Sequence, residues 1–211
     1  MARLTVLLAS AVFAATAARA AAPLTPVHIA PVPGVTFDLP HGWIACDDAT
    51  NALLGDAADP RDLKDKVCVK PNGDVTFKFR AFNPLLFRNI SMLIDQHEQQ
   101  DISATDLASI TPEVATAIAP QVCPIASKPL TGDGTTIESC TLAVDTFAGH
   151  QALHSVIVAV PPNLPEGKYQ VDIYELPYSK GYLQVQFNSP VLFKGATKAE
   201  MSAIIASFTI E

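Results

Sequence analysis

The alternation in KYQVDIYELPYSKGYLQVQF, residues 168–187, is the strongest fold signal in this chain. Strict alternation of apolar and polar residues is typical of a strand with one buried face. The apolar positions are Tyr169, Val171 and Ile173 in the first half and Leu183, Val185 and Phe187 in the second. The stretch therefore predicts two antiparallel strands, each with one face on a core and the other face wet or lightly covered.

Strand patterns also occur on both sides of this stretch. Val35, Phe37 and Leu39 share one face of VTFDL (35–39), and Asn72-Gly73 is a strong hairpin signal. Further strand-like segments are GDGTTIESCTLAVDTF (132–147), HQALHSVIVAV (150–160) and RNISMLIDQHE (88–98). The last of these segments has a longer apolar run, so a helix is an alternative prediction there. The second half of the chain is predicted to be an antiparallel meander.

One internal segment has helical periodicity instead. Between Ser103 and Gln121, apolar residues recur every three or four positions, and Thr111 precedes a proline as an N-cap would. Pro120 and Pro124 are expected to close the segment, because an interior proline breaks a helix. The pattern predicts one helix, or two short helices that meet at Thr111.

The segment TKAEMSAIIASFTIE, residues 197–211, predicts a C-terminal helix. Thr197 and Glu200 have the spacing of a capping box. Its apolar stripe consists of Met201, Ile204, Ile205 and Phe208. Trp43, the single tryptophan, follows the turn after the strand at 35–39. It could stack on a sugar or lipid, but we expect it in the core, anchoring the first strand to this helix.

The N-terminal end has the features of a secretory leader. An apolar run at residues 4–18 follows Arg3, and Ala18 and Ala20 occupy the small-residue positions before a cleavage site. The run is short for a membrane-spanning helix, which needs about 20 apolar residues. The expected organisation is a cleaved signal peptide at 1–20, a proline-rich lead-in at 21–34 and a single domain at 35–211.

The charge of the chain argues against two classes of partner. The formal charge is -7, and loss of the leader, which holds two arginines and no acids, makes it -9. An acidic domain repels phosphate backbones, so nucleic acid and anionic lipid surfaces are poor partners. We expect a periplasmic or secreted protein with no stable membrane anchor after signal cleavage.

The cysteines suggest disulfides. An even count in an exported protein is typical of paired cysteines. The four are Cys46, Cys68, Cys123 and Cys140. They allow three pairings, among which proximity in the chain favours Cys46–Cys68 and Cys123–Cys140. A zinc site is the rival interpretation, but there is no C-x-x-C pair and no histidine at ligand spacing.

The order of elements and three short motifs resemble the PsbP/DcrB-like group of small exported domains. The motifs are FDLPHGW (37–43), GYLQVQF (181–187) and AIIASFTI (203–210). The resemblance implies an α+β fold, an antiparallel β-sheet with helices packed against it in a PsbP-like α/β/α sandwich. It also implies a stabilising subunit, partner-binding module or chaperone, and it supplies no catalytic motif. The cysteines are not part of the group's general pattern.

The sequence contains few candidates for a catalytic or metal site. His150 and His154 lie four residues apart and could share a metal ion, although no third ligand is evident. The aspartates of residues 47–65 lack the spacing of a calcium loop. Ser155 is adjacent to His154 on a strand, so the two side chains point to opposite faces and cannot form a triad. We therefore expect no cofactor and no enzymatic activity.

Two hypotheses for function follow. The first is a non-enzymatic exported domain that binds or stabilises another envelope or secreted protein through a polar sheet face. That face would comprise Gln170, Asp172, Gln184 and Gln186, with tyrosines nearby. The alternative is a small-ligand or metal-binding periplasmic protein that uses His150 and His154.

Overall fold

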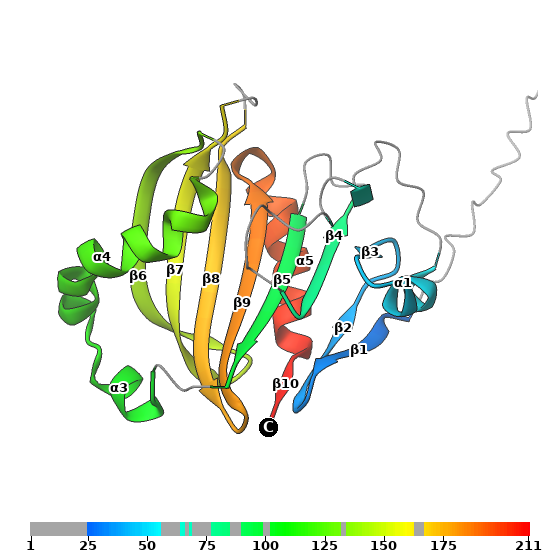
Figure 1. Cartoon of the computed structure of the whole chain (residues 1–211), viewed down its shortest axis with the longest axis horizontal. Coiled ribbons are helices and arrows are strands. Elements are labelled where there is room, and N and C mark those ends of the chain that lie inside the picture. Colours follow the sequence, from blue (N-terminus) through cyan, green and yellow to red (C-terminus); the bar gives the residue numbers. More distant parts are fainter. Residues whose placement is uncertain are drawn as a thin grey trace, which may run out of the picture.

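The computed structural model describes residues 25–55, 64–65, 68, 77–84, 90–98, 102–131, 134–162 and 167–211. The strands are β1 (Val27–Val32), β2 (Val35–Leu39), β3 (Ile44–Ala45), β4 (Phe79–Asn83), β5 (Ile90–His97), β6 (Thr136–Phe147), β7 (His150–Val160), β8 (Tyr169–Tyr178), β9 (Gly181–Pro190) and β10 (Thr209–Ile210). The helices are α1 (Asp48–Leu54), α3 (Ala104–Ser109), α4 (Pro112–Ser127) and α5 (Lys194–Ser207), with 3-10 turns η1 (Lys128–Leu130) and η2 (Val191–Phe193). The fold is α+β, as predicted (Figure 1).

The strands form two antiparallel sheets. The large sheet has the order β3-β4-β5-β9-β8-β7-β6, and the small sheet has the order β1-β2-β10. The hairpin of β8 and β9 lies within the large sheet, and its turn pairs Tyr178 with Gly181. A Cβ at Gly181 would lie 2.2 Å from the carbonyl oxygen of His97, so only glycine fits there. Residues 88–98, for which the sequence allowed either a strand or a helix, contain a strand, β5.

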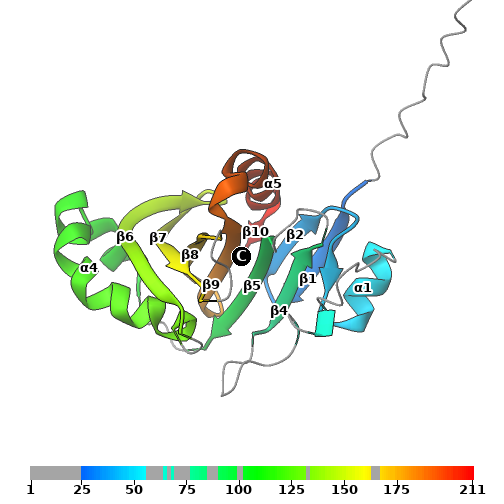
Figure 2. The ribbon, with the colours of Figure 1, turned by 90° about the horizontal axis from the view of Figure 1, so that it is seen from above.

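Different helices cover the two faces of the large sheet. In Figure 1, α4 lies in front of β6 and β7, and Figure 2 shows α5 on the opposite side, over β9 and β5. We call these sides the α4 face and the α5 face. Val171 and Ile173 pack against residues at the end of α4, whereas Leu183 and Val185 belong to the core under α5. The register explains this division, because directly paired residues share a face.

The polar face of β8, predicted to be wet or lightly covered, is covered at Asp172 and half-buried at Gln170 and Tyr174. Val171, Asp172 and Ile173 are buried in succession, so both faces of the strand are covered. Sequence alternation reports which residues lie on opposite faces of a strand. It does not report how far neighbouring side chains cover the polar side.

Trp43 lies in the main core, between the two sheets and α5. Its side chain is fully buried, and its Nε1 donates a hydrogen bond of 2.6 Å to Oε1 of Glu200 on α5. Nearby, Phe37 of β2 stacks on Phe208, which follows α5, with ring centroids 4.6 Å apart. These contacts confirm that Trp43 anchors the N-terminal strand region to the C-terminal helix.

The start of α5 differs from the prediction. The helix begins at Lys194, so Thr197 lies inside it and is buried instead of capping it. Glu200 accepts hydrogen bonds from Trp43 and from Nδ2 of Asn83, at 2.9 Å. The capping box is wrong because the helix starts three residues before Thr197, and the Glu200 carboxylate binds distant donors instead. The predicted stripe is otherwise confirmed, with Met201, Ile204 and Phe208 buried and Ile205 packed against the core.

The segment predicted to be helical, residues 103–121, forms two helices, α3 and α4. This is one of the two predicted alternatives. The Thr111 side chain accepts a hydrogen bond from the amide of Val114 and caps α4. Pro120 and Pro124 do not close the segment, because both lie inside α4. Packing on β6 and the disulfide from Cys123 hold the helix where the prolines remove backbone hydrogen bonds.

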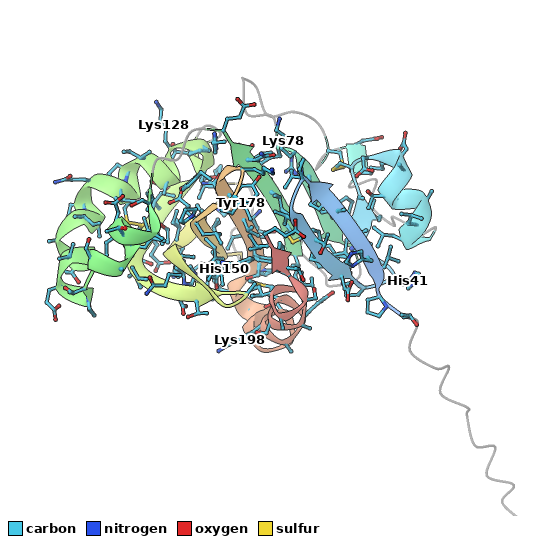
Figure 3. All side chains as sticks on the ribbon, turned by 90° about the horizontal axis from the view of Figure 1, so that it is seen from below. His41, Lys78, Lys128, His150, Tyr178 and Lys198 are labelled. Carbon is cyan, nitrogen blue, oxygen red and sulfur yellow. A yellow bond between two sulfur atoms is a disulfide. The ribbon has the colours of Figure 1, made fainter. Side chains whose placement is uncertain are left out.

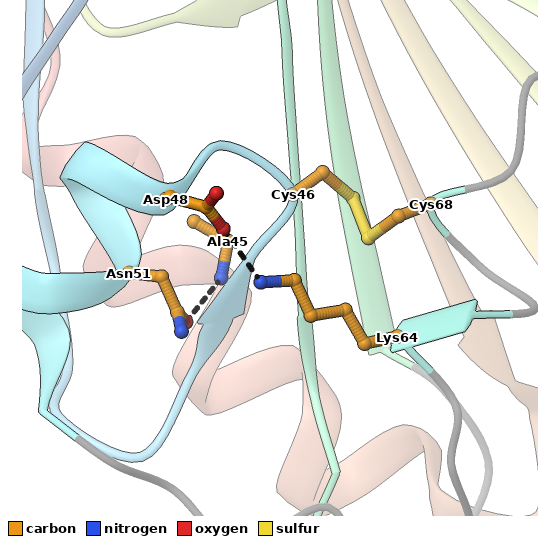
Figure 4. Close-up of a disulfide and its surroundings, with 6 residues drawn as sticks. All are labelled: Ala45, Cys46, Asp48, Asn51, Lys64 and Cys68. Carbon is orange, nitrogen blue, oxygen red and sulfur yellow. Dashed lines mark hydrogen bonds and ion pairs between the residues drawn. A yellow bond between two sulfur atoms is a disulfide. The ribbon is translucent and has the colours of Figure 1, made fainter.

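Both predicted disulfides are present, Cys46–Cys68 and Cys123–Cys140. Figure 4 shows the first, which follows β3 at the start of α1. Beside it, the Lys64 ammonium lies 3.0 Å from Asp48, and Asn51 accepts a hydrogen bond from the Ala45 amide. The second disulfide joins α4 to β6. None of the described cysteines is free.

Residues 27–32, which we expected to be a lead-in before the domain, form β1 and pair with β2. The segment is extended, as its prolines indicate, but it is part of the small sheet. The predicted signal peptide and the Asn72-Gly73 hairpin lie outside the described residues. Among the helices of the described residues, none is long and apolar enough to cross a membrane.

Candidate functional site

A cluster of polar side chains surrounds His154 on the α5 face of β6, β7 and β8. The register pairs His154 with Ala143 on one side and Tyr174 on the other. Nε2 of His154 lies 3.2 Å from Oδ1 of Asp172, and Nδ1 lies 3.4 Å from Oδ2 of Asp145. The imidazole also stacks on the Tyr174 ring, with centroids 4.1 Å apart and planes at 12°. Both nitrogens of this ring therefore face carboxylates.

Asp172 is the buried acid of this cluster, with 5% of its surface exposed. Nε2 of Gln170 lies within hydrogen-bond distance of both carboxylate oxygens, at 3.0 and 2.9 Å. With His154, these contacts satisfy an acid that would be costly to bury alone. Asp145 differs, because 58% of its side chain is exposed. The cluster therefore has one accessible carboxylate, that of Asp145. Beside it, Asp172, His154 and Gln170 are held by contacts with one another.

Burial, followed by the carboxylates of Asp172 and Asp145, raises the pKa of the Tyr174 phenol well above its ordinary value of 10. Burial also raises the pKa of Tyr178. A phenolate beside two carboxylates is unfavourable because like charges repel and because a buried charge loses hydration. Tyr174 therefore remains a neutral phenol at physiological pH.

We expect Tyr174 to make the folded protein sensitive to alkaline pH. Its pKa is higher in the folded chain than in the unfolded chain, so its stabilisation is complete below about pH 10 and is lost as the pH rises further. Tyr174→Phe should flatten the fall of melting temperature above about pH 10 relative to the natural chain. Equal slopes for the two proteins in thermal unfolding between neutral and alkaline pH would contradict this assignment.

The two histidines predicted as weak metal candidates lie on one strand, β7, and point to the same face. His154 has carboxylate partners, whereas His150 is exposed and pairs with Phe147 at the hairpin end. In the view from below, His150 lies between Tyr178 and Lys198 (Figure 3). The described residues hold no group of three or more His, Cys, Asp or Glu side chains arranged to bind a metal ion.

The structure separates the four residues predicted to form one docking face. Gln170 and Asp172 pair with Ser189 and Phe187 and lie on the α5 face. Gln184 and Gln186 pair with Glu175 and Ile173, and lie on the α4 face. On each strand the polar residues are opposite the apolar ones, as predicted, but the register inverts this pattern between β8 and β9. The four therefore cannot form one surface.

Sequence reasoning missed Asp145, and it placed Tyr174 among the tyrosines near the predicted docking face but not beside His154. A signal for Asp145 exists in the two-residue turn between β6 and β7, where Ala148 and Gly149 both have positive φ. That turn pairs Phe147 with His150 and therefore Asp145 with Ala152, beside both histidines. Placing Tyr174 beside His154 requires knowledge of the β7–β8 register, and eight residues, 161–168, separate these two strands in the sequence.

The α5 face around this cluster is open at β6. Ser139, Thr141, Ala143 and Asp145 are exposed, and Val156 and Val158 of β7 are half-buried. In Figures 1 and 2, no helix of the described part lies behind β6 and β7, because α5 stands over β9 and β5. We name this region, formed by the residues just given with His154, Gln170, Asp172 and Tyr174, the open face.

Seventeen chains of solved structures match this chain, among them the following two. PsbP (CyanoP) from Synechocystis sp. PCC 6803 matches with a TM-score of 0.51 and 13% identity, covering 89% of this chain and 93% of that chain. LpqN, described as involved in cell envelope biogenesis of Mycobacterium tuberculosis, matches with a TM-score of 0.43 and 14% identity, covering 88% and 89%. No family model and no curated protein matches the sequence. The likeness to CyanoP confirms the predicted resemblance at the level of architecture: this chain has a PsbP-like fold.

Proposed function

We propose that this protein is a non-enzymatic exported domain that binds or stabilises another envelope or secreted protein. The partner docks on the open face and presents lysine or arginine side chains to it. The leader-like N-terminal sequence and the two disulfides support export.

One observation carries the proposal, the exposed carboxylate of Asp145 above a cluster that already satisfies its own polar groups. Asp172 and His154 are paired within the chain, so docking on this face would not require their rearrangement. Half-buried Tyr174, Val156 and Val158 would supply apolar contact around the acid. The formal charge of -7 favours a basic partner, because opposite charges speed association and fix orientation.

Charge reversal at Asp145 tests the docking face. The full chain, purified with both disulfides, is used to capture partners from an envelope extract, and bound proteins are identified by mass spectrometry. We expect Asp145→Lys to weaken saturable capture about tenfold or more without lowering the melting temperature. Asp48→Lys is the matched control, because the Asp48 side chain is 96% exposed on α1, away from this face.

Retained capture by Asp145→Lys would reject this placement of the docking face. No capture by folded, oxidised bait would reject the protein-binding function itself. In that case a thermal shift with divalent metals tests the small-ligand alternative, since a ligand at 100 times its Kd stabilises a protein by about 2.7 kcal/mol.

A further inference from the structure

The four edges of the two sheets differ in how they are protected against pairing with another chain. Unpaired strand edges invite such pairing, and proteins blunt them with short strands, prolines and bulges. β3 and β10 have two residues each. β1 contains Pro31, and its pairing with β2 is irregular between Ile29 and Val32. Three edges are therefore protected.

The fourth edge, β6, has few of these protections. It is twelve residues long, contains no proline and carries only two charged residues, Glu138 and Asp145. Its single irregularity lies between Ile137 and Ser139, so the remainder pairs regularly with β7. In the part of the chain that the structure describes, no strand pairs with its outer edge.

On the α5 face, the side chains of β6 are small enough to leave room for another strand at this edge. α4 packs on the other face of β6, around Leu142 and Val144. On the α5 face, Ser139, Thr141 and Ala143 are small and exposed. A strand added at this edge would continue the sheet without a large side chain in its way.

We propose that β6 pairs antiparallel with β6 of a second copy of this chain, joining two large sheets across a two-fold axis. Such an interface is self-complementary, because the same residues contribute from both sides. A register centred on Leu142 places Thr141 opposite Ala143 of the second copy and Asp145 opposite Ser139 of the second copy. This inference does not depend on the proposed function.

The charges at the seam suit this arrangement. In this register Asp145 of one copy lies opposite Ser139 of the second copy, and therefore close to Glu138 of the second copy. Two carboxylates alone would repel there, but the Lys168 ammonium lies 2.5 Å from Glu138 and is half-exposed. Each end of the seam therefore combines two acids with one lysine, which offsets much of the repulsion.

Sedimentation of the full chain tests the proposal over about a hundredfold range of concentration, because dimerisation follows mass action. We expect the natural chain to pass from monomer to dimer. Thr141→Glu places a new acid diagonally beside Asp145 of the second copy, on both sides of the axis. The concentration at which half the chains are dimeric should therefore rise about tenfold or more.

Two further variants separate this effect from a general effect of charge. Gln151→Glu makes the same change at an exposed position of β7, inside the edge, and should leave dimerisation unchanged. Adding Asp145→Lys to Thr141→Glu makes the diagonal pair attractive and should restore the dimer. Circular dichroism and melting temperature establish that each variant is folded.

Amide hydrogen exchange of the natural chain gives an independent readout. In the dimer, alternate amides of β6, those pointing away from β7, should exchange more slowly than in the monomer. A natural chain that stays monomeric throughout would overturn the proposal. So would a dimer that survives Thr141→Glu, or one whose β6 amides show no alternate protection. Envelope capture measures the proposed function separately, so either idea can fail without the other.

Discussion

Replacing Trp43 by alanine should lower the free energy of unfolding by about 3–5 kcal/mol, the range for truncating a buried aromatic side chain. Trp43 is fully buried in the core that joins both sheets to α5. Its loss would leave a large cavity and would remove the 2.6 Å hydrogen bond that the indole donates to Glu200. Urea unfolding followed by circular dichroism measures the change, since the variant lacks tryptophan fluorescence.

Two control variants define what Trp43 contributes. Trp43→Phe keeps an aromatic ring in the core but removes the indole donor, so its loss of stability should be smaller. Glu200 would then keep its hydrogen bond from Asn83. Leu192→Ala truncates a side chain that is 67% exposed and should change stability by no more than about 0.5 kcal/mol. A similarly small effect of Trp43→Ala would contradict the anchoring role.

Removing the Cys123–Cys140 disulfide should cost about 3 kcal/mol of stability, the chain-entropy value for a loop of this length. The bond closes a sequence separation of 17 and attaches the C-terminal part of α4 to β6. α4 depends on that attachment more than most helices, because Pro120 and Pro124 remove backbone donors on either side of Cys123. Replacing both cysteines by serine should also speed amide hydrogen exchange in α4.

The Cys46–Cys68 bond is the matched control. It spans a similar separation of 22, so its removal should reduce stability by a comparable amount. It lies at the other end of the molecule, beside α1 and β3, and its loss should leave exchange in α4 at the rate set by global unfolding. Equal acceleration of α4 exchange by both double variants would show that Cys123–Cys140 has no local role.

Much of the architecture follows from short-range patterns. Period-two alternation predicted β2, β8 and β9, and strand-like segments predicted β6 and β7. The N-cap pattern at Thr111 supported one of two alternatives, the division into α3 and α4. These signals are local, because a residue's backbone preference and the direction of its side chain depend on its immediate neighbours. Proximity in the chain likewise favoured the two disulfides that are present, since short loops close at low entropic cost.

The errors have a common origin in contacts between distant segments. Glu200 was assigned to a helix cap, but Trp43 and Asn83, more than a hundred residues earlier, supply its donors. Pro120 and Pro124 were expected to end a helix that tertiary packing and a disulfide hold together. In each case a local preference was outweighed by interactions that local sequence does not encode.

The candidate site divides along the same line. His154, Gln170 and Asp172 are recognisable from the chain alone as polar residues of alternating strands. Their grouping with Asp145 and Tyr174, and the separation of Gln184 and Gln186 from them, depend on how β6, β7, β8 and β9 align. A shift of one residue in any of these registers would exchange the two faces of a strand. Long-range packing and turn geometry set those registers, so the open face exists only in the folded sheet.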